Sequence, residues 1–328
     1  MNHVVRSRRG AQKASRGRKE SRFTYLAFGL RLASNIPLPE LEFAGAGRAT
    51  CHFRLVQAGE PLPDSLAAAR WFHRLRLRDG TTWLRMGKTR HGFVLRFSKS
   101  ADFFCTPDGR TICCRPGKHL PQETLRHLLL DQVLPLALSL RRRLVLHAAA
   151  VAVPAGAIAF LGASGWGKST LAGFLALGGA PLIADDGLCL QETAAEFFTV
   201  SSYPGLRLWP NMNRKLFRRR PPLPGVAAHG SKLRVPLPPA ALESSKAPIP
   251  LQRIYLLDSS AKGADSGNPV LVARATPREA FMALCAHVIR LDLTEPRYLR
   301  WEFALLSRLS SKLLFRRLVF PRNFKQLS

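Results

Sequence analysis

Residues 162–169 match the pattern G-x-x-x-x-G-K-S/T at every fixed position. In such a loop the glycines let the backbone turn so that successive N–H groups point at phosphate oxygens, and a following helix adds the positive end of its dipole. Lys168 then supplies a cation for the β- and γ-phosphates of a nucleotide, and Ser169 offers a hydroxyl oxygen to Mg²⁺. The sequence therefore predicts a nucleotide site with Mg²⁺. The expected nucleotide-binding residues are Gly162, Ala163, Ser164, Gly165, Trp166, Gly167, Lys168, Ser169 and Thr170.

The structural context that this loop requires is present on both sides of it. Residues 157–161 form an apolar strand pattern, and the predicted helix after the loop carries Leu171 and Leu175 on one face. A glycine-rich turn that matched the pattern by chance would not need these flanks. A serine-hydrolase elbow is excluded, because that motif needs glycine two residues after its serine and Trp166 stands there after Ser164.

Two adjacent acids, Asp185 and Asp186, follow the predicted helix. The helix over residues 168–177 carries the chain about 15 Å away from the loop at about 1.5 Å per residue. An extended strand over residues 181–185 returns it by about 16 Å. A right-handed crossover would make this strand parallel to the one before the loop, so that both carboxylates emerge beside the phosphates. Such a pair suits metal binding and general-base catalysis, and the alternative is a solvated pair in a loop.

Three other features give weaker indications of function. His147 lies in the apolar strand at residues 144–148, where a lone histidine is more often a packing residue than a catalyst. The segment at residues 202–207 could reach a γ-phosphate. The basic run at residues 214–220 could bind an acidic substrate or simply be solvated.

The elements that would position these residues form two parts after a basic tail at residues 1–22. Residues 23–140 show short alternating strands with a turn at residues 107–110, followed by a helix over residues 122–140, which predicts a small, β-rich mixed α+β domain. Residues 141–328 are predicted to be an α/β domain that contains the phosphate-binding loop. Its other expected strands lie on both sides of a turn at residues 154–156, at residues 232–237 and at residues 254–257. Two helices are also expected. The first begins at the capping box of residues 276–279, and the second spans residues 296–314.

The composition sets broad limits on the partners of the protein. The chain has 328 residues, of which 46% are hydrophobic, so a large core is expected and general disorder is excluded. It carries 50 Lys and Arg against 21 Asp and Glu, a formal net charge of +29. That charge suits nucleotide phosphates, nucleic acid, an anionic membrane or an acidic peptide without choosing among them, and most of it is expected to be solvated.

The cysteines and the apolar segments indicate a reducing compartment. Six cysteines without a C-x-x-C pair argue against a zinc site and indicate reduced thiols in the cytoplasm. The nearly uncharged stretch at residues 144–161 has about the length of a membrane span, but it contains His147, Pro154 and Gly156. Two buried strands joined by a tight turn are predicted there instead. Neither a membrane span nor a secretory signal is expected.

Three segments together resemble the catalytic core of the HPr serine kinase/phosphorylase family. These are residues 146–151, the loop at residues 162–169 and residues 182–186. Two further segments, residues 128–138 and 203–210, resemble HPr-kinase-like proteins more narrowly, a group in which some members phosphorylate a serine of a lasso-peptide precursor. The resemblance covers roughly residues 23–328 and implies a P-loop kinase domain of the HPr kinase C-terminal type.

The resemblance also implies a role for each matching residue. His147 and Lys168 match active-site residues of the family. Ser169 matches its Mg²⁺ ligand, and Asp185 would assist in positioning the metal or that serine. Asp186 matches the base that takes the proton of the substrate hydroxyl.

One departure from the family affects the expected reaction. The bifunctional enzyme has a metal-binding glutamate before an Arg-Gly pair, and residues 202–205 stand in its place here. This difference counts against the phosphorylase half-reaction and against HPr itself as substrate. The expected function is therefore an ATP- and Mg²⁺-dependent serine kinase that acts on a peptide or small protein, either a lasso-precursor-like peptide or an HPr-like carrier.

Two other classes of function stay open at the level of the sequence. One is a nucleotide-binding regulatory switch without phosphotransfer, which the missing glutamate would suit. The other, less favoured, is a basic binder of nucleic acid or of a membrane surface, which the net charge alone supports. The sequence also leaves open whether the protein forms a homo-oligomer.

Overall fold

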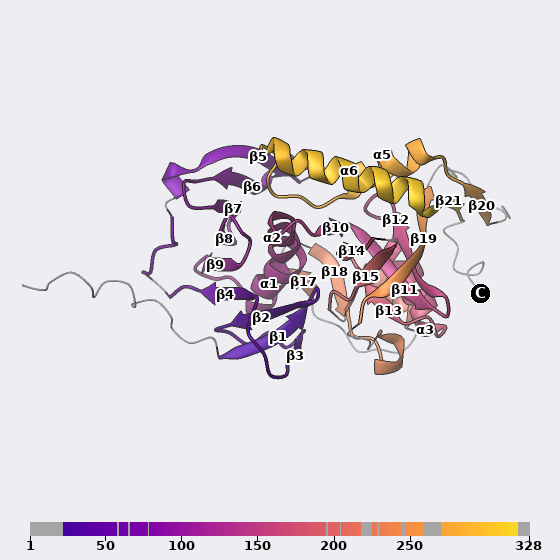
Figure 1. Ribbon diagram of the computed structural model, residues 1–328. Coiled ribbons are helices and arrows are strands. Elements are labelled where there is room, and N and C mark those ends of the chain that lie inside the picture. Colours follow the sequence, from indigo (N-terminus) through magenta and orange to yellow (C-terminus); the bar gives the residue numbers. More distant parts are fainter. Residues whose placement is uncertain are drawn as a thin grey trace, which may run out of the picture.

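The computed structural model describes residues 22–57, 59–64, 66–77, 79–194, 196–203, 205–217, 225–227, 230–243, 247–258 and 270–320. Three predicted features therefore lie outside the description, namely the basic tail up to residue 21, Pro204, and the end of the basic run at residues 218–220. Figure 1 shows one sheet formed by the N-terminal strands and another that holds the phosphate-binding loop, with the long helix α6 (Pro296–Lys312) above both.

The N-terminal residues form the first, nine-stranded sheet. Its strands are β1 (Phe23–Ala27), β2 (Leu30–Ser34), β3 (Glu42–Phe43), β4 (Cys51–Leu55), β5 (Arg70–Arg76), β6 (Thr82–Lys88), β7 (Phe93–Phe97), β8 (Ala101–Cys105) and β9 (Thr111–Pro116), with a short 3₁₀ turn at Leu66–Ala68. They lie in the order β3-β1-β2-β4-β9-β8-β7-β6-β5, and most neighbours are antiparallel, whereas β4 is parallel to both β2 and β9. The predicted turn at residues 107–110 is confirmed between β8 and β9, where Gly109 has a φ of 63°.

The helix predicted over residues 122–140 follows this sheet and is confirmed. It consists of α1 (Gln122–His127), a π-helical turn η2 (Leu128–Val133) and α2 (Leu134–Leu140). The π turn precedes Pro135, which has no N–H to donate to the carbonyl oxygen of Asp131, so the regular helical pattern is interrupted there. The apolar face of this helix packs into the core of the first sheet through residues such as Leu129.

The core of the first sheet continues into the second half of the chain. It combines strand residues such as Phe97 and Phe103 with Val145, Cys189 and Leu291. The two halves thus share buried surface, and the division of the chain into domains at residue 140 stays a prediction.

The second sheet holds the phosphate-binding loop. Its strands are β10 (Leu144–Leu146), β11 (Ala148–Val153), β12 (Gly156–Leu161), β13 (Leu182–Ala184), β14 (Leu188–Glu192), β15 (Phe197–Val200), β19 (Ile249–Asp258), β20 (Leu271–Arg274) and β21 (Leu314–Val319). The order is β10-β14-β15-β19-β12-β11-β13, with β21 beside β19 and β20 beside β21. The uncharged stretch at residues 144–161 therefore forms strands, and the predicted tight turn joins β11 to β12. Across the described residues, no helix combines the length and hydropathy needed to cross a bilayer.

The strand that carries the two aspartates returns in the predicted direction but not beside the loop strand. Strand β13 is antiparallel to β11, and β11 is antiparallel to β12, so β13 runs parallel to β12. Strand β11 lies between them, which the sequence did not predict, and the neighbour of β12 on its other side is the parallel strand β19. Because they are parallel, β12 and β13 still have their carboxyl ends on the same side of the sheet.

Helices cover the two faces of this sheet. The helix α3 (Lys168–Leu177) has the predicted bounds and packs Leu171 and Ala176 against one face. The helix α5 (Pro277–His287) and α6 pack against the other face through Leu284 and Leu305. The predicted capping box at Thr276 is present. The last predicted helix ends two residues early, because Leu314 begins β21, which pairs with β19.

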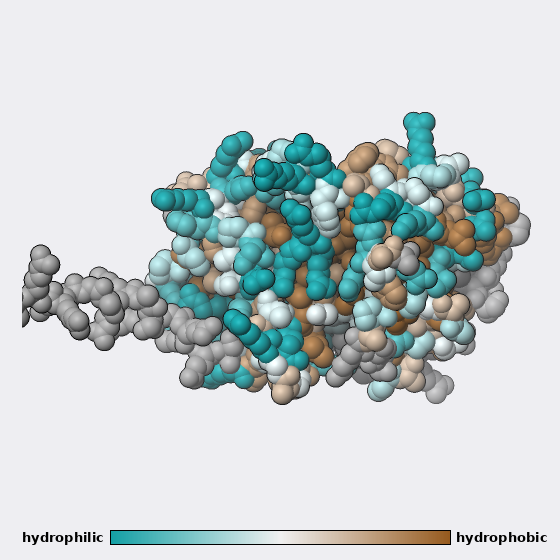
Figure 2. Space-filling view, viewed as in Figure 1, coloured by the Kyte–Doolittle hydropathy of each residue, from teal (hydrophilic) through white to brown (hydrophobic). Residues whose placement is uncertain are grey.

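A small third sheet and a short helix complete the surroundings of the loop. The strands are β16 (Leu206–Leu208), β17 (Gly225–Ala227) and β18 (Gly230–Val235), in the order β16-β18-β17, and α4 (Pro210–Leu216) follows β16; a 3₁₀ turn, Pro239–Ala241, follows β18. The strand predicted at residues 232–237 is thus β18, which begins and ends two residues earlier. Figure 2 shows hydrophilic side chains spread over the displayed face of the molecule, with hydrophobic patches between them.

Candidate active site

The phosphate-binding loop joins the end of β12 to the first turn of α3. Gly165 and Gly167 have φ angles of 84° and 94°, in the left-handed region that favours glycine. Lys168 is 5% exposed, and its Nζ donates to the carbonyl oxygens of Gly162 at 2.6 Å and Ala163 at 3.3 Å. Burial lowers the pKa of Lys168. The loop thus surrounds the cation that the sequence assigns to the phosphates.

A cavity of about 410 Å³ lies beside this loop and brings together most of the predicted residues. His147, Asp186 and the loop residues from Ser164 to Thr170 line it. The described residues that line it without having been predicted as site residues are Leu171, Arg207, Leu208, Trp209, Asn211, Met212, Lys232 and Phe320.

Three predicted residues lie behind the wall of the cavity. Gly162 and Ala163 accept the hydrogen bonds of Lys168, as described above. Asp185 is 3% exposed and accepts a hydrogen bond from Ser169 Oγ at 2.7 Å and one from the backbone N–H of Arg207 at 2.8 Å. Burial, together with the negative charge of Asp186, raises the pKa of Asp185 to about 6.

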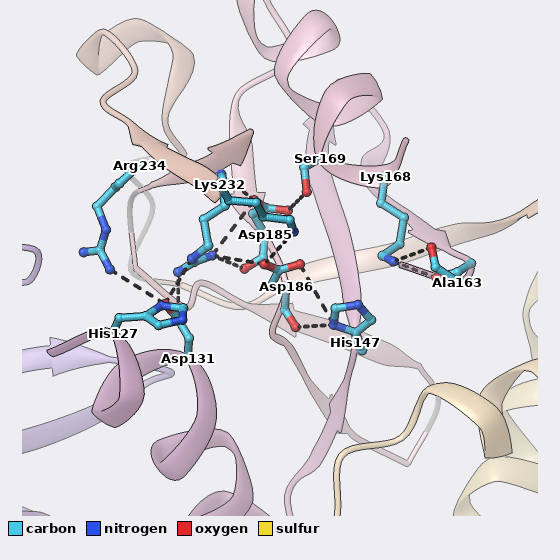
Figure 3. A network of polar contacts seen from close by, with 12 residues as sticks. His127, Asp131, His147, Ala163, Lys168, Ser169, Asp185, Asp186, Lys232 and Arg234 are labelled. Atoms are coloured by element: carbon cyan, nitrogen blue, oxygen red, sulfur yellow. Dashed lines mark hydrogen bonds and ion pairs between the residues drawn. The ribbon is translucent and has the colours of Figure 1, made fainter. Parts of the chain in front are cut away.

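Asp186 differs from its neighbour because it faces the cavity (Figure 3). Its φ of 65° is unusual for a residue other than glycine, and this conformation in the turn between β13 and β14 gives the two carboxylates different surroundings. Its carboxylate lies 3.6 Å from Lys232 Nζ, 3.9 Å from Arg207 Nη1 and 4.0 Å from His147 Nδ1. Burial opposes its ionisation, but the positive charges of Lys232, Arg207 and Lys168 outweigh burial and lower the pKa of Asp186 to about 2.

His147 lies between β10 and β11 and touches the aspartate turn. Its backbone N–H donates to the carbonyl oxygen of His287 at 2.7 Å, and its Nδ1 lies 3.2 Å from the carbonyl oxygen of Asp186. Since a carbonyl oxygen only accepts, Nδ1 carries the proton in this contact and Nε2 is left as an acceptor. Burial lowers the pKa of His147 although Asp186 opposes this shift, so the ring is neutral at pH 7.

Two cations of the site were missed or given little weight by the sequence. The sequence predicts Arg207 only as part of a loop, whereas it lies in β16 with a side chain that is 2% exposed. Lys232 was not singled out, and it reaches Asp186 from β18. The sequence did hold one signal for it, because Lys232 and Arg234 alternate along a strand and therefore share one face.

The oxygen atoms that could hold Mg²⁺ come from Ser169 and Asp185. Both are hard donors, and Mg²⁺ usually takes only one or two protein oxygens and completes its shell with water and phosphate. Asp186, which lines the cavity, adds a further acceptor, because its Oδ1 is buried and has no hydrogen-bond partner among the described residues. Within the described part of the chain, no group of three or more His, Cys, Asp and Glu side chains could hold a metal ion. These oxygen donors fit a cation that is bound partly by the protein and partly by phosphate oxygens.

Comparison with known proteins finds a distant structural likeness. No family model matches the chain, and no curated protein matches it. Among solved structures, the chain is similar to one described as the Hpr(Ser) kinase/phosphatase from Coxiella burnetii, at 15% identity and a TM-score of 0.27, over 56% of this chain and 89% of that one.

Proposed function

We propose that the protein is a kinase that transfers the γ-phosphoryl group of ATP, with Mg²⁺, to a serine hydroxyl of a peptide or small protein. The observation that carries this proposal is the contrast between two consecutive acids beside a phosphate-binding loop. Asp185 bonds the loop hydroxyl of Ser169 at 2.7 Å, whereas Asp186 faces the cavity. A metal-binding pair and a carboxylate for the acceptor hydroxyl would thus lie side by side.

The lining of the cavity suits both ends of a nucleotide. Its volume is within the range of about 300–1,000 Å³ that is usual for small-molecule sites. The cationic residues, which would attract phosphates, are Lys168, Arg207 and Lys232. The aromatic and thioether residues, which would stack on a base, are Trp166, Trp209, Met212 and Phe320.

Each polar residue of the site has a defined part in the proposed transfer. Bound Mg-ATP would supply the phosphoryl group with part of its charge neutralised. Ser169 Oγ and Asp185 would hold the metal, and Lys168 Nζ would donate to phosphate oxygens. Asp186 faces the cavity as a carboxylate and would accept the proton of the substrate hydroxyl. His147 holds the main chain of Asp186 through the 3.2 Å contact and so keeps this carboxylate in place.

The acceptor is proposed from the motifs and from the charge near the cavity. Serine on a lasso-precursor-like peptide or an HPr-like carrier is what the resemblance to HPr-kinase-like proteins implies. The exposed Arg214 lies on α4, within three residues of Asn211 and Met212 in the cavity wall. A positive charge at this place would favour a substrate with an acidic segment.

The proposal is tested by phosphotransfer from labelled ATP. Purified protein with Mg²⁺ and peptides encoded by neighbouring genes should yield an acid-stable, base-labile phosphoserine. Lys168→Ala should abolish this product and weaken ATP binding, because it removes the cation from the loop. Lys118→Ala, an exposed lysine outside the cavity, is the matched control and should behave as the wild type.

One outcome of this experiment would favour the regulatory switch instead. If the protein binds ATP and hydrolyses it slowly, but neither the candidate peptides nor a cell lysate contains a labelled acceptor, phosphotransfer is not its function. If Lys168→Ala binds ATP and turns it over like the wild type, the assignment of the loop itself is wrong.

A further inference from the structure

A second buried carboxylate, Asp131, lies next to the site but outside its cavity. It belongs to the π-helical turn η2, and its side chain is 2% exposed. Arg207 donates to it from Nε at 3.0 Å and also from Nη2. The hydroxyl of Tyr203 donates to it as well, and Nδ1 of His127 lies within hydrogen-bond distance. Asp131 is thus held by donors from two distant parts of the chain. Figure 3 shows Asp131 beside His127.

The charge of Asp131 is balanced by arginine rather than by histidine. Burial, and then the charges of Arg207 and Arg234, lower the pKa of His127 to about 3, so the ring is neutral and its Nδ1–H can only donate a hydrogen bond. Arg234 Nη2 lies 3.7 Å from Asp131 and its Nη1 lies 3.2 Å from Glu40, so it is shared between two carboxylates. The direct, two-point partner of Asp131 is therefore Arg207.

The opposite side of the same guanidinium faces the proposed catalytic acids. Arg207 Nη1 donates to the backbone carbonyl oxygen of Asp185 at 3.0 Å. The same atom lies 3.9 Å from Oδ2 of Asp185 and 3.9 Å from Oδ2 of Asp186. Arg207 therefore approaches the Asp186 carboxylate without forming a hydrogen bond to it.

Without Asp131, the guanidinium of Arg207 would not stay 3.9 Å from the Asp186 carboxylate. Arginine prefers two parallel hydrogen bonds to one carboxylate, and the carboxylate of Asp186, which lines the cavity, lies 3.9 Å from Arg207 Nη1. If Asp131 did not hold Nε and Nη2, the fork could turn onto Asp186 and occupy the oxygen atoms that the acceptor hydroxyl needs. The stacking of Arg207 on the Tyr203 ring, at 5.2 Å, adds to its restraint.

We propose that Asp131 is a positioning residue of the active site, which holds Arg207 beside the Asp186 carboxylate and keeps it from closing on that carboxylate. This inference rests on the proposed function and extends it, because a residue from the helix after the first sheet becomes part of the machinery. Residues 141–328 would then contain the phosphate-binding loop without all of the groups that arrange the acids.

The test compares two isosteric changes of buried acids that pair with arginine. Asp131→Asn should lower kcat about 10- to 100-fold and change the KM for ATP little, since a misplaced group costs rate more than binding. Glu302→Gln is the matched control, because Glu302 is 5% exposed and pairs with Arg290 at 2.7 Å, with no residue of the pair in the cavity. It should leave kcat unchanged. In the double variant Asp131→Asn with Arg207→Lys, kcat should fall no further than in Arg207→Lys alone.

A second measurement does not depend on turnover. In ¹⁵N-arginine NMR spectra, the Nε–H resonance of Arg207 should be protected from exchange in the wild type and in Glu302→Gln, and should exchange faster in Asp131→Asn, because the amide keeps only one acceptor oxygen and no charge. If the wild type transfers no phosphate, the proposed function fails, and this resonance still decides whether Asp131 anchors Arg207.

The following outcomes would overturn the inference. They are a folded Asp131→Asn with wild-type kcat, an Arg207 Nε–H that stays protected in that variant, or an equal loss of kcat in Glu302→Gln. If Asp131→Asn does not fold, Tyr203→Phe replaces it, because it removes the hydroxyl that donates to Asp131 and accepts from Arg207 Nη2, and it keeps the ring on Arg207. Its kcat should fall several-fold at constant KM, and an unchanged kcat would then reject the proposal.

Discussion

Asp185 and Asp186 are neighbours in sequence but have opposite environments. Burial behind Ser169 raises the pKa of Asp185 to about 6, whereas the surrounding cations lower the pKa of Asp186 to about 2. The positive φ of Asp186 underlies this difference, since it turns the second carboxylate into the cavity. Two acids whose environments differ in this way are suited to different tasks.

We therefore predict different defects for the two amide variants. Asp186→Asn should lose phosphotransfer by at least about a hundredfold while still binding Mg-ATP, because a general base contributes about 10²–10⁴-fold to rate. Asp185→Asn should instead raise the Mg²⁺ concentration needed for half-maximal rate, and excess metal should restore part of the activity. Initial rates at a series of Mg²⁺ concentrations measure both effects.

The same titration shows how the assignment could be wrong. If excess Mg²⁺ restores the Asp186 variant and not the Asp185 variant, the two acids have exchanged roles. If neither substitution slows transfer, the acids take no part in it and the proposed mechanism is wrong.

At the scale of elements, the loop, the start of α4 and the residue after β21 supply the aromatic part of the cavity, through Trp166, Trp209 and Phe320. Trp166→Leu should weaken ATP binding about tenfold, because a base stacked on an aromatic ring contributes ~1–3 kcal/mol. The affinity for inorganic tripolyphosphate should stay the same, since the cationic residues are untouched. Titration calorimetry with both ligands measures the two affinities.

Trp301→Leu is the control for this prediction, because Trp301 is also partly buried but lies in α6, packs against the core beneath that helix and does not line the cavity. It should leave both affinities unchanged. A Trp166 variant that loses affinity for both ligands equally would mean that the ring supports the loop and does not contact a base.

Local sequence patterns predicted the bounds of the elements around the site, but they did not predict which strands lie next to each other in the sheet. The bounds of α3 could be predicted because the loop precedes it and Gly178 and Gly179 end it. The position of β11 between β12 and β13 could not be predicted, because the alternation of apolar and polar side chains shows which residues face a core but not which strands pair. Strand β21 was missed because Leu313 and Leu314 continue the spacing of the preceding helix.

The same limit applies to the side chains of the site. The residues of the loop and the acid pair are joined by one helix and one strand, so counting residues was enough to bring them together. Arg207, Lys232 and Asp131 arrive from a third sheet and from the first helix, and no local spacing relates them to the loop. Their convergence depends on how separate layers pack.

At the scale of the whole molecule, the net charge of +29 is not concentrated in the cavity. Exposed basic residues such as Arg76, Arg214 and Arg300 lie on β5, α4 and α6, which are far apart in the chain. We therefore predict that the protein binds heparin and elutes with salt, because dispersed cations bind polyanions non-specifically.

This binding should be independent of the nucleotide site. The salt concentration at elution should be the same for the wild type, for Lys168→Ala and for the wild type with Mg-ATP. If nucleotide or the Lys168 variant shifts elution strongly, the polyanion occupies the cavity, and the basic-binder class would regain support.

The pairing of β12 has a consequence for how the chain folds during its synthesis. The apolar strand before the loop receives β11 at once, but its other edge waits for β19, and β19 in turn waits for β21. At a synthesis rate of about 5–20 residues per second, the interval between β12 and β19 is on the order of ten seconds. Throughout that interval the nascent chain presents an unpaired apolar edge beside its phosphate loop, which is the kind of surface that chaperones bind and that aggregates when they are scarce.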